Sequence, residues 1–372
     1  MGEEIRSAIR DGVRLFPRGS GSWWPDTPRD TRPLPLEGLD HVAGLAPADL
    51  MVTVGAGCRL DFLDRALRER GVWLALDPPG PLARTVGGVL ASGGGGPLAT
   101  HYGPPRDHVL GLTVVAGNGT PVRMGGRVVK NVAGFDLAKL VVGGHGAFGV
   151  IVEAHLRVRA LPAADVSAAW TGSLRDVAAA AARALGAGAD PAALEALSPA
   201  LSRRLLATDA WALASRHQGG PVAVEEDLAA VAGAVGRSLL RHDLRDAPTL
   251  WRGWRETVGA WPVIARLGAD PASWPEALAL AEQHLGEPLG VSATVPRGTV
   301  RVGFAAAGEL AVHALRDSAA RRGWPVTLER SDAALRAAAG VWGALEPGAR
   351  RLTERLRAAH DPNGVFAVPL LA

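Results

Sequence analysis

The sequence of 372 residues contains a single cysteine, Cys58. One thiol cannot form an internal disulfide, and it cannot supply a Cys-ligated iron–sulfur cluster or the usual cysteine-based structural zinc site. The lone cysteine therefore favours a reducing compartment. The ten histidines are scattered and none shows the spacing of a ligand pair, so we expect no metal site.

Long apolar runs and strong net charge are also missing. No run of 18 apolar residues occurs, and the N-terminus has neither the basic start nor the apolar core of a signal peptide. We expect a cytoplasmic protein with no integral membrane segment, which a complex could still hold at the inner face of a membrane. The net charge is +3 and no basic run reaches five residues, so nucleic acid is not an expected partner.

The composition changes along the chain, and the change predicts two domains of an α+β fold. Residues 1–162 are rich in Gly, Pro and Val, and Asn118-Gly119 between two apolar runs predicts a hairpin. Residues 163–330 alternate short strands with Ala-rich helices, which indicates two ferredoxin-like units side by side. Residues 331–372 contain a last helix and a tail that we expect to return toward the first domain.

The stretch "VVGGHGAFGV" carries Gly144, Gly146 and Gly149 at the spacing of the dinucleotide fingerprint. That fingerprint requires a strand before the glycines and a helix after them. Here "FDLAKLVV" predicts a helix behind an Asp136 cap, and alternation from Val150 to Val158 predicts a strand afterwards. This order disfavours an NAD-binding Rossmann turn, so the glycines indicate a sharp turn or a close approach to a ligand.

Two more glycine-rich segments precede it. "PRGSGS", residues 17–22, can form an anion nest of backbone amides beside Arg18, although an ordinary turn explains it equally well. "TVGGVLASGGGG", residues 85–96, predicts a turn into a short helix that presents amides to an anion, and a flexible loop is its alternative. Three such loops together indicate a cradle for an extended, phosphate-bearing, planar cofactor.

These segments, with "YGPPRDHVLGLTVV" between them, resemble in order and spacing the FAD-binding domain of the vanillyl-alcohol oxidase and p-cresol methylhydroxylase (PCMH-type) flavoproteins. Within that superfamily "KNVAGFDLAKL" is most similar to the FAD-binding small subunit of bacterial glycolate oxidase. The resemblance implies a two-subdomain FAD-binding domain over residues 1–162 and a ferredoxin-like cap over 163–330, which serves the substrate or a subunit interface.

The resemblance also implies a set of cofactor-binding residues. The first loop would wrap the FAD pyrophosphate, the second would form the opposite wall, a connecting loop would follow, and the third would lie beside the adenosine or ribityl part. These residues are Arg18, Gly19, Ser20, Gly21 and Ser22; Thr85, Val86, Gly87, Gly88, Ala91 and Ser92; Tyr102, Gly103 and Arg106; and Gly146, Gly149, Val150 and Ile151. Ser22 stands where members with covalent flavin often carry histidine, so the FAD is expected to be non-covalent.

The implied function is oxidation of a 2-hydroxy acid such as glycolate or D-lactate, with electrons leaving through a larger FAD-binding subunit and an iron–sulfur subunit. The chain lacks the histidine-rich metal and substrate segment of related dehydrogenases and the usual Asn-Pro-Gly close after Phe366. No catalytic residue is therefore predicted; His101 and His145 are the histidines nearest the expected flavin. A non-catalytic assembly subunit and a free-standing FAD-dependent alcohol oxidase remain alternatives. The Trp-rich residues 251–261 favour core packing over an interface or a lid.

Overall fold

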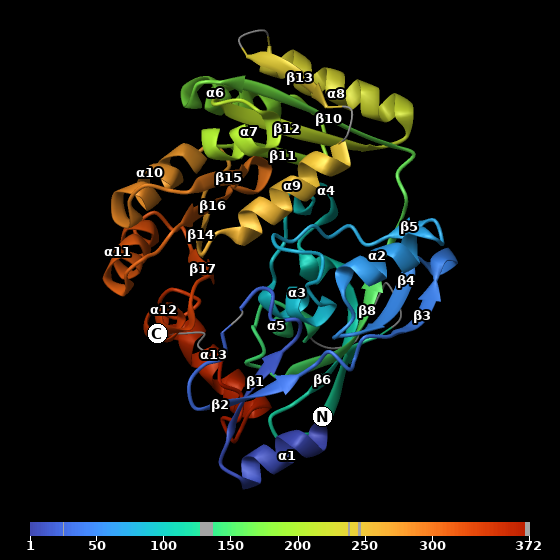
Figure 1. Cartoon of the computed structure of the whole chain (residues 1–372), viewed down its shortest axis with the longest axis vertical. Helices are drawn as coiled ribbons and strands as arrows, with labels where there is room; N and C mark the ends of the chain where they lie inside the picture. The colour runs from blue at the N-terminus through green and yellow to red at the C-terminus, as the bar shows by residue number, and fades with distance from the viewer. Residues whose placement is uncertain (25, 127–136, 237–238, 245–246, 369–372) are drawn as a thin grey trace.

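The computed structural model describes residues 1–24, 26–126, 137–236, 239–244 and 247–368. Figure 1 shows two bodies: the N-terminal half, coloured blue to teal, lies below a broad sheet that runs from green to orange. The red C-terminal helices run back down to the lower body. Helices and mainly antiparallel sheets together confirm the α+β class. No helix in the described ranges combines the length and apolar character needed to cross a bilayer.

The N-terminal half is built on a five-stranded antiparallel sheet in the order β3-β4-β8-β6-β7. Its strands are β3 (Val42–Ala46), β4 (Met51–Gly55), β6 (Val109–Val115), β7 (Pro121–Gly125) and β8 (Val150–Arg157). Asn118-Gly119 lies in the turn between β6 and β7, and Gly119 has a φ of +79°, so the predicted hairpin is confirmed.

The described residues of this half also form two small sheets and five short α-helices. β1 (Arg14–Arg18) pairs in parallel with β2 (Thr31–Pro35), and β5 (Val72–Trp73) pairs with β9 (Arg159–Ala160). The helices are α1 (Gly2–Arg10), α2 (Leu60–Arg68), α3 (Val86–Ser92), α4 (Ala99–Tyr102) and α5 (Ala138–Val141). α2 is amphipathic, because Leu60, Leu63 and Leu67 recur at helical spacing and are buried in the core of the sheet.

The second half folds into one eight-stranded sheet in the order β13-β10-β12-β11-β15-β16-β14-β17. Its strands are β10 (Ala164–Gly172), β11 (Ala193–Leu197), β12 (Trp211–Gly219), β13 (Leu240–Leu244), β14 (Val263–Gly268), β15 (Gly290–Thr294), β16 (Thr299–Phe304) and β17 (Val326–Arg330). In each set of four strands the first and third lie in the centre, which is the ferredoxin-like arrangement. The two units join where β11 pairs with β15.

Helices cover both faces of this sheet. α6 (Leu174–Leu185), α8 (Pro221–Val235), α10 (Trp274–Leu285) and α11 (Glu309–Ala320) pack on one face, and α7 (Pro199–Leu206) and α9 (Ala247–Ala260) pack on the other. α9 lies between the sheet and the lower body in Figure 1. The Trp-rich stretch forms most of α9, and Trp251, Trp254 and Trp261 are buried against the sheet, so the core-packing interpretation holds.

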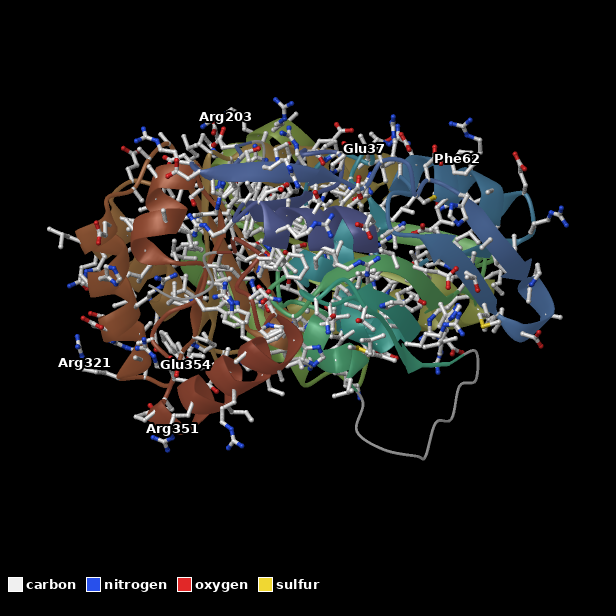
Figure 2. The ribbon with its side chains drawn as sticks, turned by 90° about the horizontal axis from the view of Figure 1, so that it is seen from below. Glu37, Phe62, Arg203, Arg321, Arg351 and Glu354 are labelled. Atoms are coloured by element: carbon white, nitrogen blue, oxygen red, sulfur yellow. The ribbon has the colours of Figure 1, made fainter. Side chains whose placement is uncertain are left out.

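After α12 (Ala333–Ala339) and α13 (Pro347–His360) the chain returns to the N-terminal half. The Leu15 amide donates to the carbonyl of Val365 at 2.7 Å, and the Ala367 amide donates to that of Leu15 at 2.9 Å. The Asp361 carboxylate fixes this tail by accepting hydrogen bonds from the amides of Val365 and Phe366. Charged side chains of α13, such as Arg351 and Glu354, point outward in Figure 2, so α13 has a charged face exposed to solvent.

Candidate functional site

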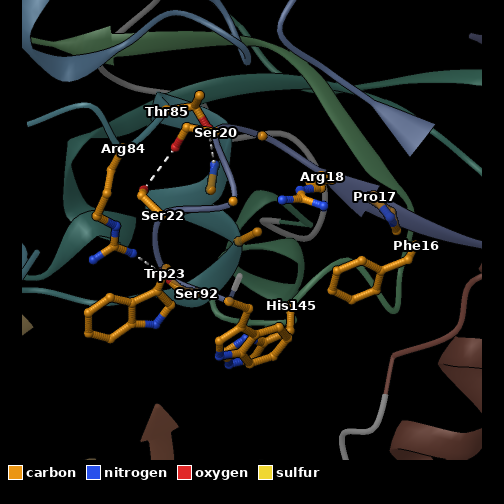
Figure 3. A pocket seen from close by; sticks show the side chains of 15 residues that line it. Phe16, Pro17, Arg18, Ser20, Ser22, Trp23, Arg84, Thr85, Ser92 and His145 are labelled. Atoms are coloured by element: carbon orange, nitrogen blue, oxygen red, sulfur yellow. Dashed lines mark hydrogen bonds between the residues drawn. The ribbon is translucent and has the colours of Figure 1, made fainter. Parts of the chain in front are cut away.

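A pocket of about 100 Å³ lies among the glycine loops of the N-terminal half (Figure 3). Many of its walls were predicted from the sequence: Arg18, Gly19, Ser20, Gly21, Ser22, Thr85, Gly88, Ala91 and Ser92. Others were not among the predicted cofactor residues: Phe16, Pro17, Trp23, Trp24, Arg84 and His145. The pocket therefore draws on the first and second loops and on one residue of the third.

The first loop offers free backbone donors. It begins where β1 ends at Arg18, and no group in the described part of the chain accepts a hydrogen bond from the amides of residues 19–22. Gly21 has a φ of +64°, a conformation in which glycine is unstrained and successive amides turn to one side. The Arg18 guanidinium lies over Gly21, and the hydroxyls of Ser20 and Ser22 are 2.8 Å apart. These groups form a nest whose chemistry suits an anion.

The second loop differs, because its amides bond within the protein. The Val86 amide donates to the carbonyl of Cys58 and the Gly87 amide to that of Ala56, both at 2.8 Å. The Thr85 hydroxyl caps α3 by accepting from the Gly88 amide at 3.2 Å. The sequence prediction that this turn presents amides to an anion is therefore wrong. Val86 and Gly87 are buried behind the pocket wall, and Thr85 and Gly88 form its surface.

The third loop is fastened to the end of α3. The amides of Gly143 and His145 donate to the carbonyls of Leu90 and Ala91, and a Cβ on Gly93 would stand 2.9 Å from the Gly143 Cα atom. A helix, α5, enters this loop and β8 leaves it, as predicted; Asp136, the expected cap, lies outside the described residues. The three loops thus converge in space.

Aromatic rings and guanidinium groups close the pocket. Trp24 stacks on His145 with ring centroids 4.9 Å apart and planes within 5°, and the Arg336 guanidinium lies 4.7 Å from the Trp24 ring. The Arg84 guanidinium lies 4.2 Å from the Trp23 ring and donates to the Ser92 hydroxyl. The indole N–H groups of Trp23 and Trp24 are buried, and neither has a hydrogen-bond acceptor among the described residues. Buried donors of this kind suit a ligand with acceptor atoms.

The electrostatics of the pocket favour an anion. Burial lowers the pKa of Arg84 to about 9, but the group stays positive at neutral pH. Burial, assisted by the positive charges of Arg266 and Arg336, lowers the pKa of His145 to about 3, so this imidazole stays neutral. A neutral, stacked ring is a platform rather than a proton acceptor at physiological pH.

The structure does not bring every predicted residue to the pocket. The Tyr102 ring packs edge-on to Trp73, and its hydroxyl donates to Gln218 of the upper sheet at 3.2 Å. Gly103 packs against Asp107, and Arg106 is exposed. Gly149, Val150 and Ile151 are buried at the start of β8, and a Cβ on Gly146 would contact Pro17 and Val368. As cofactor contacts these residues stay predictions.

The missed residues carried a weak signal. Trp23 and Trp24 follow the first loop directly, and Arg84 directly precedes the second, so adjacency to a predicted loop could have found them. Phe16 and Pro17 belong to the strand that delivers the first loop. The stack of Trp24 on His145 joins residues 121 positions apart and could not be read from the sequence.

Comparison with known proteins agrees with this geometry. Residues 2–125 match a family described as FAD binding domain. Glycolate oxidase subunit GlcE of Escherichia coli (strain K12) is 36% identical over 168 residues, which are 44% of this chain and 48% of that protein. Glycolate oxidase subunit GlcD of Bacillus subtilis (strain 168) is 33% identical over 154 residues, 39% of this chain and 32% of that protein. The chain thus spans less than half the length of either relative.

Solved structures share the whole fold. The structure of p-cresol methylhydroxylase with substrate bound has a TM-score of 0.79 over 98% of this chain and 85% of that chain, at 15% identity. A 4-ethylphenol oxidase from Gulosibacter chungangensis has a TM-score of 0.75 over 100% of this chain and 87% of that chain, at 15% identity.

The fold is therefore that of the PCMH-type flavoproteins, as predicted. Residues 2–125 carry an FAD binding domain, glycolate oxidase subunits are among the homologues of the chain, and these matches support FAD as its cofactor. The residues present fit that cofactor, because the nest of free amides beside Arg18 suits a diphosphate and the buried aromatic walls suit a planar ring.

Proposed function

We propose that this chain is the FAD-binding small subunit of a complex that oxidises a 2-hydroxy acid such as glycolate or D-lactate. The observation that carries the proposal is the 36% identity with the glycolate oxidase subunit GlcE over 168 residues. The partners would be a larger FAD-binding subunit and an iron–sulfur subunit, to which electrons pass. The complex would be cytoplasmic, with peripheral attachment to the inner face of the membrane.

Bound FAD supplies the acceptor for a hydride from the hydroxyl-bearing carbon. The protein binds and orients it. In this proposal the amides of residues 19–22 and the Arg18 guanidinium hold the diphosphate without a covalent link, and the Thr85–Ser92 wall fixes the opposite side. Trp24 and His145 supply flat surfaces, and Arg84 with Arg336 supplies positive charge that favours an anionic substrate.

A second candidate is a non-catalytic subunit that keeps the FAD-binding fold in order to assemble a larger catalytic partner. The observation in its favour concerns His145, the histidine that lines the pocket. It is stacked under Trp24 and its pKa is lowered to about 3, so it is poorly suited to accept the proton of a hydroxyl group.

Spectroscopy of the purified full chain separates these functions. Retained flavin, visible as yellow absorption and released by acid, supports the cofactor site, and anaerobic bleaching by glycolate or D-lactate locates a complete substrate site in this chain. Flavin without bleaching favours the assembly subunit, which co-purification with a larger flavoprotein would then support. A folded, colourless protein that cannot be reconstituted with FAD contradicts the oxidising function and favours the assembly subunit. The Gly21→Val variant serves as the flavin-poor control.

A further inference from the structure

A second cleft lies between α2 and α9, apart from the pocket among the glycine loops, which we call the flavin pocket. It has a volume of about 170 Å³ and shares no lining residue with that pocket. α9 rests on the segment that separates the two: the Gly80 amide donates to the carbonyl of Arg255 at 2.9 Å, and Gly259 packs against Gly80. The cleft is therefore a distinct space at the boundary of the two halves of the molecule.

Its walls differ in chemistry. The side formed by α2 and the residues near β5 is largely apolar, with Leu63, Trp73 and Leu82 among its members, and its charged groups are Asp64, Arg68 and Asp77. The side formed by α9 and β12 carries the guanidinium groups of Arg216, Arg252 and Arg255. A ligand that fills the cleft would therefore meet an apolar surface on one side and positive charge on the other.

Two of the arginines in the cleft are already neutralised by carboxylates. Arg68 pairs with Asp64 at 2.8 Å, and Arg216 makes two hydrogen bonds to Asp165, at 2.9 and 2.6 Å. No ion pair of Arg252 or Arg255 within 4.0 Å is found among the described residues, although the charges of Asp77, Glu256 and Asp64 act on Arg255 from farther away. The Arg255 Nε–H is buried and lacks an acceptor in the described part of the chain. A buried guanidinium donor without an acceptor costs free energy, which an anionic ligand would recover.

We propose that this cleft binds a small organic carboxylate with an apolar body, and that Arg255 holds the carboxylate. Asp64 and Asp77 also line the cleft, and burial raises the pKa of Asp77 to about 7. The charge of Asp64, joined by that of Asp77 above this pH, would repel a dianion, so a monoanion fits better than phosphate. The apolar wall demands more than a bare carboxylate, since burying hydrocarbon against leucine and tryptophan supplies much of the affinity of such sites.

Fluorine NMR of the full chain labelled with fluorotryptophan tests the proposal, because Trp73 and Trp251 line the cleft while Trp23 and Trp24 line the flavin pocket. Their signals are assigned with single Trp→Phe variants. Phenylacetate is expected to shift the Trp73 and Trp251 signals saturably. Acetate, which lacks the apolar body, and phenylethanol, which lacks the charge, should each need at least about tenfold higher concentration.

Variants then test the role of Arg255. We expect Arg255→Gln to weaken phenylacetate binding about tenfold or more, Arg255→Lys to retain most of it, and Arg68→Gln, at an ion-paired position on the rim, to change it less than about threefold. If Arg255→Gln lowers the melting temperature, Leu82→Phe, which fills part of the cleft, must abolish binding instead. Unmoved Trp73 and Trp251 signals, movement of Trp23 and Trp24 in their place, or equal binding of phenylethanol overturns the proposal.

Discussion

The first and second glycine loops look alike in sequence, yet they use their backbones in opposite ways. In the first, the amides of residues 19–22 find no acceptor among the described groups, Gly21 has a positive φ, and all four residues line the pocket. In the second, the amides of Val86 and Gly87 are bonded to the carbonyls of Cys58 and Ala56. Glycine in the first loop exposes donors to a ligand, and glycine in the second lets α3 pack closely on the chain after β4.

The third loop stands between these cases. Its amides at Gly143 and His145 bond to the end of α3, but the His145 side chain reaches the pocket from a backbone with a φ of +51°. The comparison teaches that glycine density marks where loops converge, whereas the hydrogen-bond partners of the amides decide which loop binds. Substitutions that separate flavin affinity from protein stability test this distinction.

The largest effect on flavin affinity is expected at Gly21. Valine is strained at a φ of +64°, so Gly21→Val would turn amides away from the diphosphate. Loss of two hydrogen bonds to a charged group corresponds to about a hundredfold weaker FAD binding. Flavin content and FAD titration measure this, and the melting temperature of the flavin-free protein should change little. Normal FAD affinity in this variant would contradict the claim that the first loop binds FAD through its free amides.

The reverse pattern is expected at Gly87. A Cβ there would stand 2.7 Å from the Ala56 Cβ and 2.9 Å from its carbonyl oxygen, so Gly87→Val overpacks the contact behind α3. We expect about 1–3 kcal/mol loss of stability in urea unfolding of the flavin-free protein. Its neighbour Gly88 is exposed on the pocket side, and Gly88→Val should lower FAD affinity with a smaller loss of stability. Equal stability of the Gly87→Val and Gly88→Val variants would count against assigning Gly87 to close packing and Gly88 to the pocket surface.

The Arg18 variant tests the side-chain charge of the first loop, whereas the glycine variants test backbone conformation. Arg18→Gln removes the guanidinium beside Gly21 and should weaken FAD binding about tenfold, with a shallower dependence of affinity on salt. Arg32→Gln, at an exposed position on the neighbouring strand β2, is the matched control and should leave FAD affinity unchanged. Identical salt dependence in the Arg18 variant and the original protein would argue against a diphosphate at this loop.

The smallest expected effect is at His145, where the free energy of unfolding depends on pH. Its pKa is about 3 when folded and about 6.5 when unfolded, so below pH 6.5 the unfolded state binds the extra proton and stability falls. Between pH 7 and 5 this site costs about 1–2 kcal/mol of stability. His145→Asn suits the positive φ and removes this cost, so its unfolding free energy should fall less on acidification than that of the original protein. Parallel pH profiles would contradict the burial of His145.

Much of the architecture followed from local pattern. Strand alternation from Val150 to Val158 and the hairpin at Asn118-Gly119 follow from periodicity and turn chemistry, and the structure confirms them. The two ferredoxin-like units were also predictable, because each strand is bounded by a clear helix or turn. The pairing of β11 with β15, which joins the units, depends on contacts distant in sequence.

The candidate site was harder to predict in detail, because its parts are set by tertiary contacts. A resemblance in spacing placed Tyr102 with the cofactor residues, which stays a prediction, and the sequence does not reveal that its ring packs on Trp73 and its hydroxyl donates to Gln218. The sequence likewise cannot show that Ala56 and Cys58 take up the amides of the second loop, since those carbonyls belong to another segment. Local sequence identifies turns, and the folded chain decides which of their donors are left over.

Amide-resolved NMR of the labelled full chain during FAD titration tests the central claim most directly. The account predicts large shifts for the amides of residues 19–22, which gain a diphosphate acceptor, and small shifts for those of Val86 and Gly87, whose acceptors are carbonyls of the protein in both states. Large shifts at Val86 and Gly87 with a silent first loop would contradict it.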